Sequence, residues 1–170
     1  MDTPHTRETQ TREQAHWNDI TSDPALHDLP YKVETNAQGQ LLLSPHRNRH
    51  SIHQEAVQNL LREHAPPGMA PPEFAIATPA GVKTPDVVWM RPERWEKMQA
   101  TGDPTTLAPE ICVEVMSRSN TEAEMEEKRA LYRAAGAAEV WVVDEAGAIR
   151  FFADEELDAS RIAPGCPAAV

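Results

Sequence analysis

The sequence predicts a single domain of the α/β type, of mixed α+β character, in which a central sheet is flanked by helices. Strand-like and helix-like segments alternate along the chain, and 170 residues with 40% hydrophobic and 25% charged side chains suit one globular domain. We expect that domain to span residues 25–170. Residues 1–24 are polar, with Trp17 and Ile20 as large apolar side chains, and predict a flexible or arm-like segment with room for a short helix.

A hairpin and a helix open the predicted domain. Residues 31–43 alternate apolar and polar side chains, pass through a small polar turn and end in an apolar run, which predicts an N-terminal β-hairpin. Residues 49–64 carry apolar side chains at steps of one, three and four, the spacing of one helix face. Pro66 and Pro67 predict the end of that helix.

Strands and a second long helix make up the remainder. The strongly apolar run at residues 111–116 predicts a buried strand that contains one charge, Glu114. Ser119 or Asn120 can cap a helix that Gly136 ends. The other predicted elements are short: strands over 74–78, 83–90, 140–143 and 149–152, and one helical turn over 94–99 in the loop 91–107.

Two acidic residues interrupt segments that are otherwise apolar. An unpaired carboxylate at Glu114 would cost several kcal/mol in a buried strand, unless that position faces solvent. Asp86 follows Pro85 at the start of another strand, although Pro-Asp alone is a common turn dipeptide. Together, carboxylates at the ends of neighbouring strands can hold a hard divalent cation, because Mg²⁺ prefers oxygen ligands.

The helix after Glu114 carries a lysine with two possible environments. Lys128 shares a helix face with Leu131 and Tyr132, which predicts that it points towards the sheet. The alternative is a plain surface pair with Glu124. The acidic run in the first turns suits a solvated face and the positive end of the helix dipole.

Several of these segments together resemble a known bacterial family. The similarity covers roughly residues 40–165; it includes the helix at 50–61 and Pro85-Asp86, and its most specific part runs from Glu114 to Trp141. The sequence resembles the family described as "putative restriction endonuclease", which belongs to the PD-(D/E)XK nuclease superfamily. The resemblance implies a restriction-endonuclease-like fold and a site for Mg²⁺ or Mn²⁺. It implies that Asp86 and Glu114 are the metal carboxylates and that the backbone carbonyl of Val115 completes the ligand set.

The resemblance also implies roles for residues outside the acid pair. Met116 stands where the superfamily pattern has its lysine, so the catalytic amine is assigned to Lys128, with Tyr132 supporting it. His50 and Gln54 of the early helix match positions where the family often keeps polar residues, and the neighbouring Glu55 can replace them; ordinary surface exposure of all three is the equal alternative. Arg118 stands where the family usually has proline, in the loop beside the metal carboxylate.

Composition favours an intracellular protein and gives little support for nucleic acid as a partner. Two cysteines, Cys112 and Cys166, make no disulfide framework or metal-ligand spacing. The sequence has neither an apolar run of membrane-spanning length nor a signal-peptide pattern, so we expect a cytoplasmic protein without a membrane partner. The formal net charge of −11 opposes binding to DNA.

The sequence thus predicts a metal-dependent endonuclease that hydrolyses DNA phosphodiester bonds. Arg47 and Arg49 are the candidate DNA contacts, and this small basic patch predicts weak, salt-sensitive binding that a homodimer would strengthen. The alternative is a non-catalytic dimeric scaffold or regulatory binding module that keeps the nuclease fold. A hydrolase of small phosphate compounds is the least favoured, because no glycine-rich phosphate loop is present.

Overall fold

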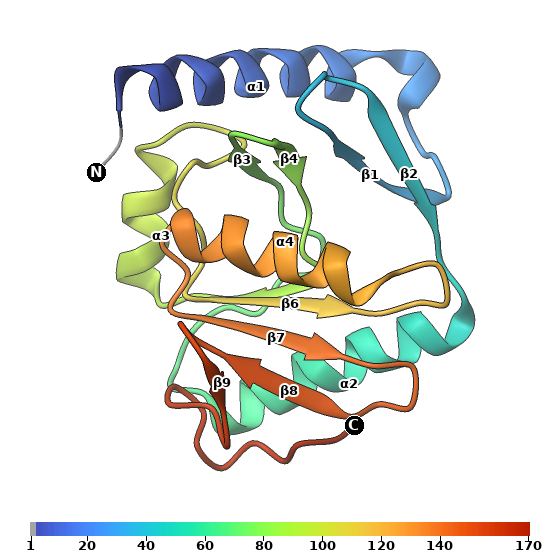
Figure 1. Ribbon diagram of the computed structural model, residues 1–170, viewed down its shortest axis with the longest axis vertical. Coiled ribbons are helices and arrows are strands. Elements are labelled where there is room, and N and C mark those ends of the chain that lie inside the picture. The colour runs from blue at the N-terminus through green and yellow to red at the C-terminus, as the bar shows by residue number, and fades with distance from the viewer. Residues whose placement is uncertain (1–2) are drawn as a thin grey trace.

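The computed structural model describes residues 3–170 and is built around a five-stranded mixed sheet in the order β5-β6-β7-β8-β9 (Figure 1). Two separate hairpins, β1-β2 and β3-β4, lie at one side of this sheet. The elements in chain order are α1 (Pro4–Ser22), a 3₁₀ turn (Pro24–Leu26), β1 (Tyr31–Thr35), β2 (Leu41–Pro45), α2 (Asn48–His64), β3 (Ile76–Thr78), β4 (Gly81–Lys83), β5 (Val87–Trp89), α3 (Pro92–Gln99), β6 (Ile111–Val115), α4 (Glu122–Ala134), β7 (Glu139–Val143), β8 (Ile149–Phe152) and β9 (Glu156–Leu157).

The main sheet is mixed, which confirms the predicted fold class. Strands β6 and β7 are parallel, whereas β5-β6, β7-β8 and β8-β9 are antiparallel. Helix α4 provides the crossover that a parallel pair requires. Among residues 3–170, no helix combines the length and apolar character needed to cross a membrane.

Alternation along β6 assigns its side chains to two different cores. Ile111, Val113 and Val115 pack in a cluster with Val57 and Leu61 of α2. Cys112 points to the other face, in a cluster with Tyr132 of α4. Glu114 has the same parity as Cys112, so the strand directs its carboxylate towards α4.

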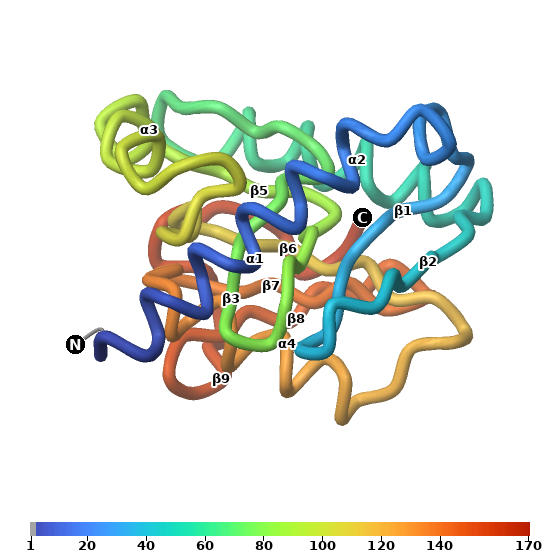
Figure 2. The backbone as a smooth tube through the Cα atoms, turned by 90° about the horizontal axis from the view of Figure 1, so that it is seen from above, coloured from blue at the N-terminus to red at the C-terminus, as the bar shows by residue number. Residues whose placement is uncertain are grey.

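The N-terminal segment is more ordered than its sequence suggested. A 19-residue helix, α1, replaces the predicted short one. It lies across the β3-β4 hairpin in the view from above (Figure 2). Gln14 donates to the carbonyls of Thr101 and Pro104, and His16 lies 2.8 Å from the carbonyl of Gly39. These polar contacts hold a helix whose apolar content is small; the division into arm and domain stays a prediction.

Several element boundaries differ from the prediction for local reasons. The single strand predicted over residues 83–90 is divided into β4 and β5, because Pro85 cannot donate to a ladder. Thr121 caps α4, in place of the predicted Ser119 or Asn120, since Glu124 completes a capping box with it. Strand β9 was not predicted, because two residues are too short for a clear periodic pattern, and α3 (Pro92–Gln99) begins two residues before the predicted helical turn over 94–99.

The two hairpins bring β1 over the α4 face of the sheet. The Thr35 hydroxyl accepts from Val82 N–H at 2.8 Å, and Lys83 donates to the Thr35 carbonyl at 2.9 Å. Gly81 has a φ of +103°, and a side chain there would meet the β1 backbone at Thr35. These contacts fix the hairpin so that its buried charged residues face the end of β6.

Glu139 fixes the C-terminal segment to the sheet through four accepted hydrogen bonds. The donors are Trp141 Nε1, Ser160 Oγ, Arg161 N–H and Ile162 N–H, at 2.7–3.1 Å.

Glu139→Gln places an amide NH₂ against donors, so we expect it to lower the free energy of unfolding by about 2–4 kcal/mol. Denaturant unfolding measures this, with exposed Glu55→Gln as the control. A loss under about 0.5 kcal/mol for Glu139→Gln would contradict the assigned role.

Candidate active site

Asp86 lies at the entrance to β5 and is completely buried. Its own N–H donates to the carbonyl of Val113 at 2.9 Å, which continues the β5-β6 ladder to this residue. Its Oδ2 accepts from the N–H of Val115 at 2.7 Å, and His50 Nε2 lies 3.4 Å from the same oxygen. Backbone and side chain together therefore lock this carboxylate beside the end of β6.

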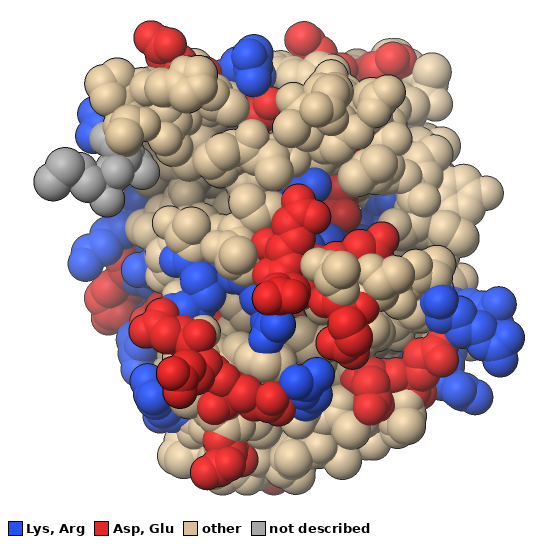
Figure 3. Space-filling model, viewed as in Figure 1, with Lys and Arg blue, Asp and Glu red and all other residues tan. Residues whose placement is uncertain are grey.

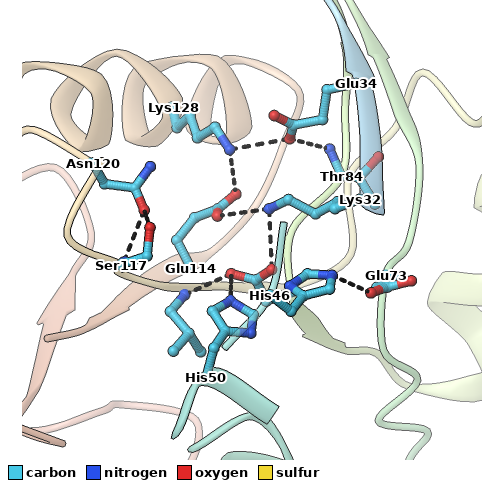
Figure 4. A network of polar contacts seen from close by, with 12 residues as sticks. Lys32, Glu34, His46, His50, Glu73, Thr84, Glu114, Ser117, Asn120 and Lys128 are labelled. Atoms are coloured by element: carbon cyan, nitrogen blue, oxygen red, sulfur yellow. Dashed lines mark hydrogen bonds and ion pairs between the residues drawn. The ribbon is translucent and has the colours of Figure 1, made fainter. Parts of the chain in front are cut away.

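Glu114 receives two donors from α4 on a single oxygen. Its Oε1 accepts from the hydroxyl of Tyr132 at 2.6 Å and from Lys128 Nζ at 3.2 Å. Lys128 Nζ also donates to Glu34 Oε1 at 3.0 Å (Figure 4). The structure thus places Lys128 and Tyr132 at the acid pair, and the alternative pairing of Lys128 with Glu124 is wrong.

Lys32, which the sequence did not single out, lies between the two carboxylates. Its Nζ is 3.0 Å from Asp86 Oδ1 and 3.5 Å from Glu114 Oε2, and only 7% of its side chain is exposed. Glu34, two residues along β1, points to the same side and accepts from Thr84 N–H at 2.7 Å. The only signal in the sequence was the alternation of charged and apolar residues along β1. Alternation alone does not tell which side of the hairpin faces the core.

Burial and neighbouring charges shift the pKa values of these groups in different directions. Burial raises the pKa of Asp86, but Lys32 and His50 together with the Val115 N–H outweigh it and hold that pKa well below its usual range. Burial also raises the pKa of Glu114, and there the two lysines do not fully reverse it. Asp86 is therefore the firmly ionised member of the pair.

The cationic and phenolic groups respond to the same acids. Burial lowers the pKa of Lys32, but Glu114, Asp86 and Glu34 raise it above its usual value. The pKa of Lys128 is also raised, since Glu114 and Glu34 outweigh its burial. Burial first, and then the charge of Glu114, raise the pKa of Tyr132 well above its ordinary value, so its hydroxyl stays protonated at neutral pH and donates a hydrogen bond.

Of the three polar candidates on α2, the structure brings one to the acid pair. His50 is 8% exposed and faces Asp86, and its Nδ1 has no partner among the described residues. Gln54 is half-buried and Glu55 is exposed, and neither makes a hydrogen bond or ion pair with Asp86 or Glu114. Position on the same helix is thus not enough, because only His50 among the three faces Asp86.

A cavity of about 620 Å³ opens onto this cluster. Its charged wall contains Lys32, Glu34, Glu114 and Lys128, and its opposite wall is the exposed edge of β2, residues 41–43. Of the acid pair, Glu114 therefore lines this cavity.

A smaller cavity of about 170 Å³ lies on the other side of His50. The start of α2 and the loop after β6 form it, and its lining includes Arg47, Arg49, His53 and Arg118. The structure gives the three arginine side chains no hydrogen bond or ion pair within residues 3–170, and all three are exposed. Arg47 and Arg49, the candidate DNA contacts, therefore lie next to the acid cluster, and Arg118 joins them.

The donor set fits a small hard cation that retains water ligands. Residues 3–170 contain no group of three or more His, Cys, Asp or Glu side chains arranged to hold a metal ion. Mg²⁺, however, is commonly bound by only one or two carboxylates and several waters. The Lys32 ammonium shows that an oxygen of Asp86 and an oxygen of Glu114 converge on one positive charge.

Comparison with known proteins agrees with this architecture. A family model described as "Putative restriction endonuclease" (Uma2) matches residues 23–162. The fold is similar to that in a crystal structure of "a putative nuclease belonging to DUF820" from Anabaena variabilis, with a TM-score of 0.63 and 12% identity over 81% of this chain and 86% of that one. No curated protein matches the sequence. Because the family model covers most of its length, the chain belongs to the Uma2 family, described as "Putative restriction endonuclease".

Proposed function

We propose that this protein is a metal-dependent endonuclease that hydrolyses phosphodiester bonds in DNA. The observation that carries the proposal is the convergence of Asp86 and Glu114 on one cationic group, with a second lysine, Lys128, on the far side of Glu114. Family membership supports the nuclease class. The acid pair and Lys128 are the parts that phosphoryl chemistry needs: anionic ligands for a metal and a cation for developing charge.

Asp86 and Glu114 would hold Mg²⁺ or Mn²⁺, with the carbonyl of Val115 as a further ligand. The N–H of Val115 donates to Asp86, and the N–H and C=O of one strand residue point to the same side of the strand, so this carbonyl faces the acid pair. When bound, the ion supplies Lewis acidity at a phosphoryl oxygen and a water of lowered pKa. Asp86 is kept ionised at neutral pH by Lys32, His50 and the Val115 N–H.

Lys128 and Tyr132 act from α4 on the same carboxylate. Tyr132 donates to Glu114 Oε1 and is completely buried, so it fixes the direction of that side chain. Lys128 reaches Glu114 and Glu34 and lines the larger cavity, where it can stabilise negative charge on a phosphate or position a water. Tyr132 is thus a positioning residue, and Lys128 is the candidate catalytic amine.

Local charge provides a route to DNA in spite of the acidic total. Asp and Glu gather over α4 in Figure 3, and Lys and Arg gather at both edges of this view. The right-hand group lies where α2 begins beside the loop that enters α4 (Figure 1). Arg47, Arg49 and Arg118 are free to bind phosphates flanking the scissile one. Because the patch is small, the expected affinity is weak and salt-sensitive, and a homodimer would double it.

One observation favours the second candidate, a non-catalytic scaffold or regulatory module. Lys32 and Lys128 already compensate the buried carboxylates, so the fold has no need of a metal to bury them. On that hypothesis the acid cluster is structural, and the protein neither binds Mg²⁺ nor cleaves DNA.

Plasmid cleavage separates the two candidates. We expect the wild type to nick or linearise DNA with Mg²⁺ or Mn²⁺ and to be inactive with EDTA. Asp86→Asn should lose activity by roughly 10²-fold or more, because it removes one anionic metal ligand. Exposed Asp158→Asn should cleave as the wild type does. Full cleavage by Asp86→Asn, or none by any folded form with either metal, would contradict the proposal.

Lys128→Ala tests the assigned amine. We expect the cleavage rate to fall by roughly 10²-fold, as when one transition-state donor is removed. Lys128→Arg should rescue poorly, since guanidinium is a planar fork rather than a compact charge. Because Lys128 also compensates two buried acids, rates are compared below the melting temperature of each variant, with exposed Lys97→Ala as the control. A rate for Lys128→Ala equal to the control would remove the residue from the mechanism.

The arginine cluster should determine the salt dependence of DNA binding. Each lost phosphate contact lowers the slope of log K against log[salt] by about 0.9. We therefore expect the triple variant Arg47→Ala, Arg49→Ala, Arg118→Ala to have a slope smaller by roughly 2–3 in fluorescence anisotropy titrations. Arg7→Ala, an exposed arginine of α1, should leave the slope unchanged. Equal slopes for the triple variant and this control would exclude the cluster from the DNA interface.

A further inference from the structure

The four carboxylate oxygens of Asp86 and Glu114 fall into two pairs that face different donors. Asp86 Oδ2 is taken by the Val115 N–H and faces His50, and Glu114 Oε1 is taken by Tyr132 and Lys128. The two remaining oxygens, Asp86 Oδ1 and Glu114 Oε2, both face Lys32 Nζ. Any cation that binds both carboxylates through their remaining oxygens must therefore use the oxygens that Lys32 now contacts.

We infer that Lys32 is a built-in competitor of the metal, so that a divalent ion binds Asp86 and Glu114 only when the Lys32 ammonium moves away. This inference rests on the proposed metal-dependent function and goes beyond it, because it assigns a control on metal affinity to a residue of the β1 hairpin. Lys32 holds the site in a closed, metal-free arrangement that is already stable.

The surroundings of Lys32 provide a place for the displaced ammonium. Glu34 lies two residues further along the same strand, on the same side. Its Oε1 accepts from Lys128 and from Thr84 N–H, whereas its Oε2 receives no hydrogen bond from the described residues. The cavity that opens onto the cluster is lined by both Lys32 and Glu34, so the lysine can turn towards Glu34 without crossing the core.

Competition of this kind makes the apparent metal affinity equal to the intrinsic affinity multiplied by the fraction of molecules in which the lysine has moved away. Where the closed arrangement holds about 90% of molecules, removing the ammonium tightens metal binding roughly tenfold. A structural lysine that merely supported the site would have the opposite effect, because its loss would disorder the carboxylates and weaken binding.

Calorimetric titration of the full chain with Mn²⁺ at neutral pH tests the inference directly. We expect Lys32→Met to bind Mn²⁺ at least about tenfold more tightly than the wild type. Lys97→Met is the control: Lys97 is exposed on α3 and makes no hydrogen bond or ion pair within residues 3–170, so its replacement should leave the affinity unchanged.

Thermal unfolding with EDTA and with Mn²⁺ provides a second readout that is independent of cleavage. Lys32→Met leaves two buried carboxylates without their shared cation, so it should melt lower than the wild type in EDTA and recover most of that loss in Mn²⁺. The wild type should shift much less. Where Lys32→Met does not fold even with Mn²⁺, Lys32→Gln replaces it, since glutamine is polar and uncharged.

The outcomes separate the inference from the function on which it rests. Equal or weaker Mn²⁺ affinity in both Lys32 variants, with clear binding by the wild type, overturns the competitor role and leaves the metal site standing. Absence of Mn²⁺ binding in the wild type and in every variant overturns the inference together with the metal-dependent function. Tighter binding and metal-restored melting in the Lys32 variants alone support it.

Discussion

The site depends on charge compensation inside a desolvated cluster. Three buried carboxylates, on Glu34, Asp86 and Glu114, share two ammonium groups, on Lys32 and Lys128. Removing either ammonium group would leave carboxylate charge uncompensated away from water, and that cost exceeds what an ion pair contributes to stability. A cation that binds Asp86 and Glu114 would contact the same oxygens that Lys32 now compensates. Stability of the metal-free fold and affinity for a metal are therefore set by the same residues.

Four separate parts of the chain must meet for this cluster to exist. Strand β6 turns Glu114 towards α4, α4 returns Lys128 and Tyr132 to it, and the start of β5 brings Asp86 alongside. The β1-β2 hairpin then closes the cluster with Lys32 and Glu34, because its contacts with β4 fix its height above the sheet. The hairpin is thus part of the site rather than an appendage to the fold.

The sequence predicted the parts of the site that lie on regular elements with a strong pattern. A charge within the apolar run of β6 indicated Glu114, and helical spacing placed Lys128 and Tyr132 on one face. Lys32 was not predictable in this way, because the two sides of a short hairpin look alike until its packing is known, and the polar side of β1 turned out to face the core. The extent of α1 was missed for a related reason: polar residues such as Gln14 and His16 hold it, and a hydrophobic pattern does not detect them.

The overall charge of the chain is a poor guide to its partner. Carboxylates gather over α4 on the face drawn in Figure 3, whereas Arg47, Arg49 and Arg118, which have no ion pair within residues 3–170, line a cavity at the start of α2. Interaction with a polyanion depends on the local potential, which falls off within about 10 Å at moderate salt. A net charge of −11 is thus compatible with a restricted phosphate-binding surface.

A crystal structure of the protein soaked with Mn²⁺, with the ion located by its anomalous scattering, tests the central claim most directly. The predicted result is an ion in contact with Asp86 Oδ1 and Glu114 Oε2 at roughly 2.0–2.6 Å, with Lys32 turned away from both oxygens. A fully soaked crystal in which Lys32 still bridges Asp86 and Glu114, and no anomalous density lies between the two carboxylates, would contradict the claim that this cluster is a metal site.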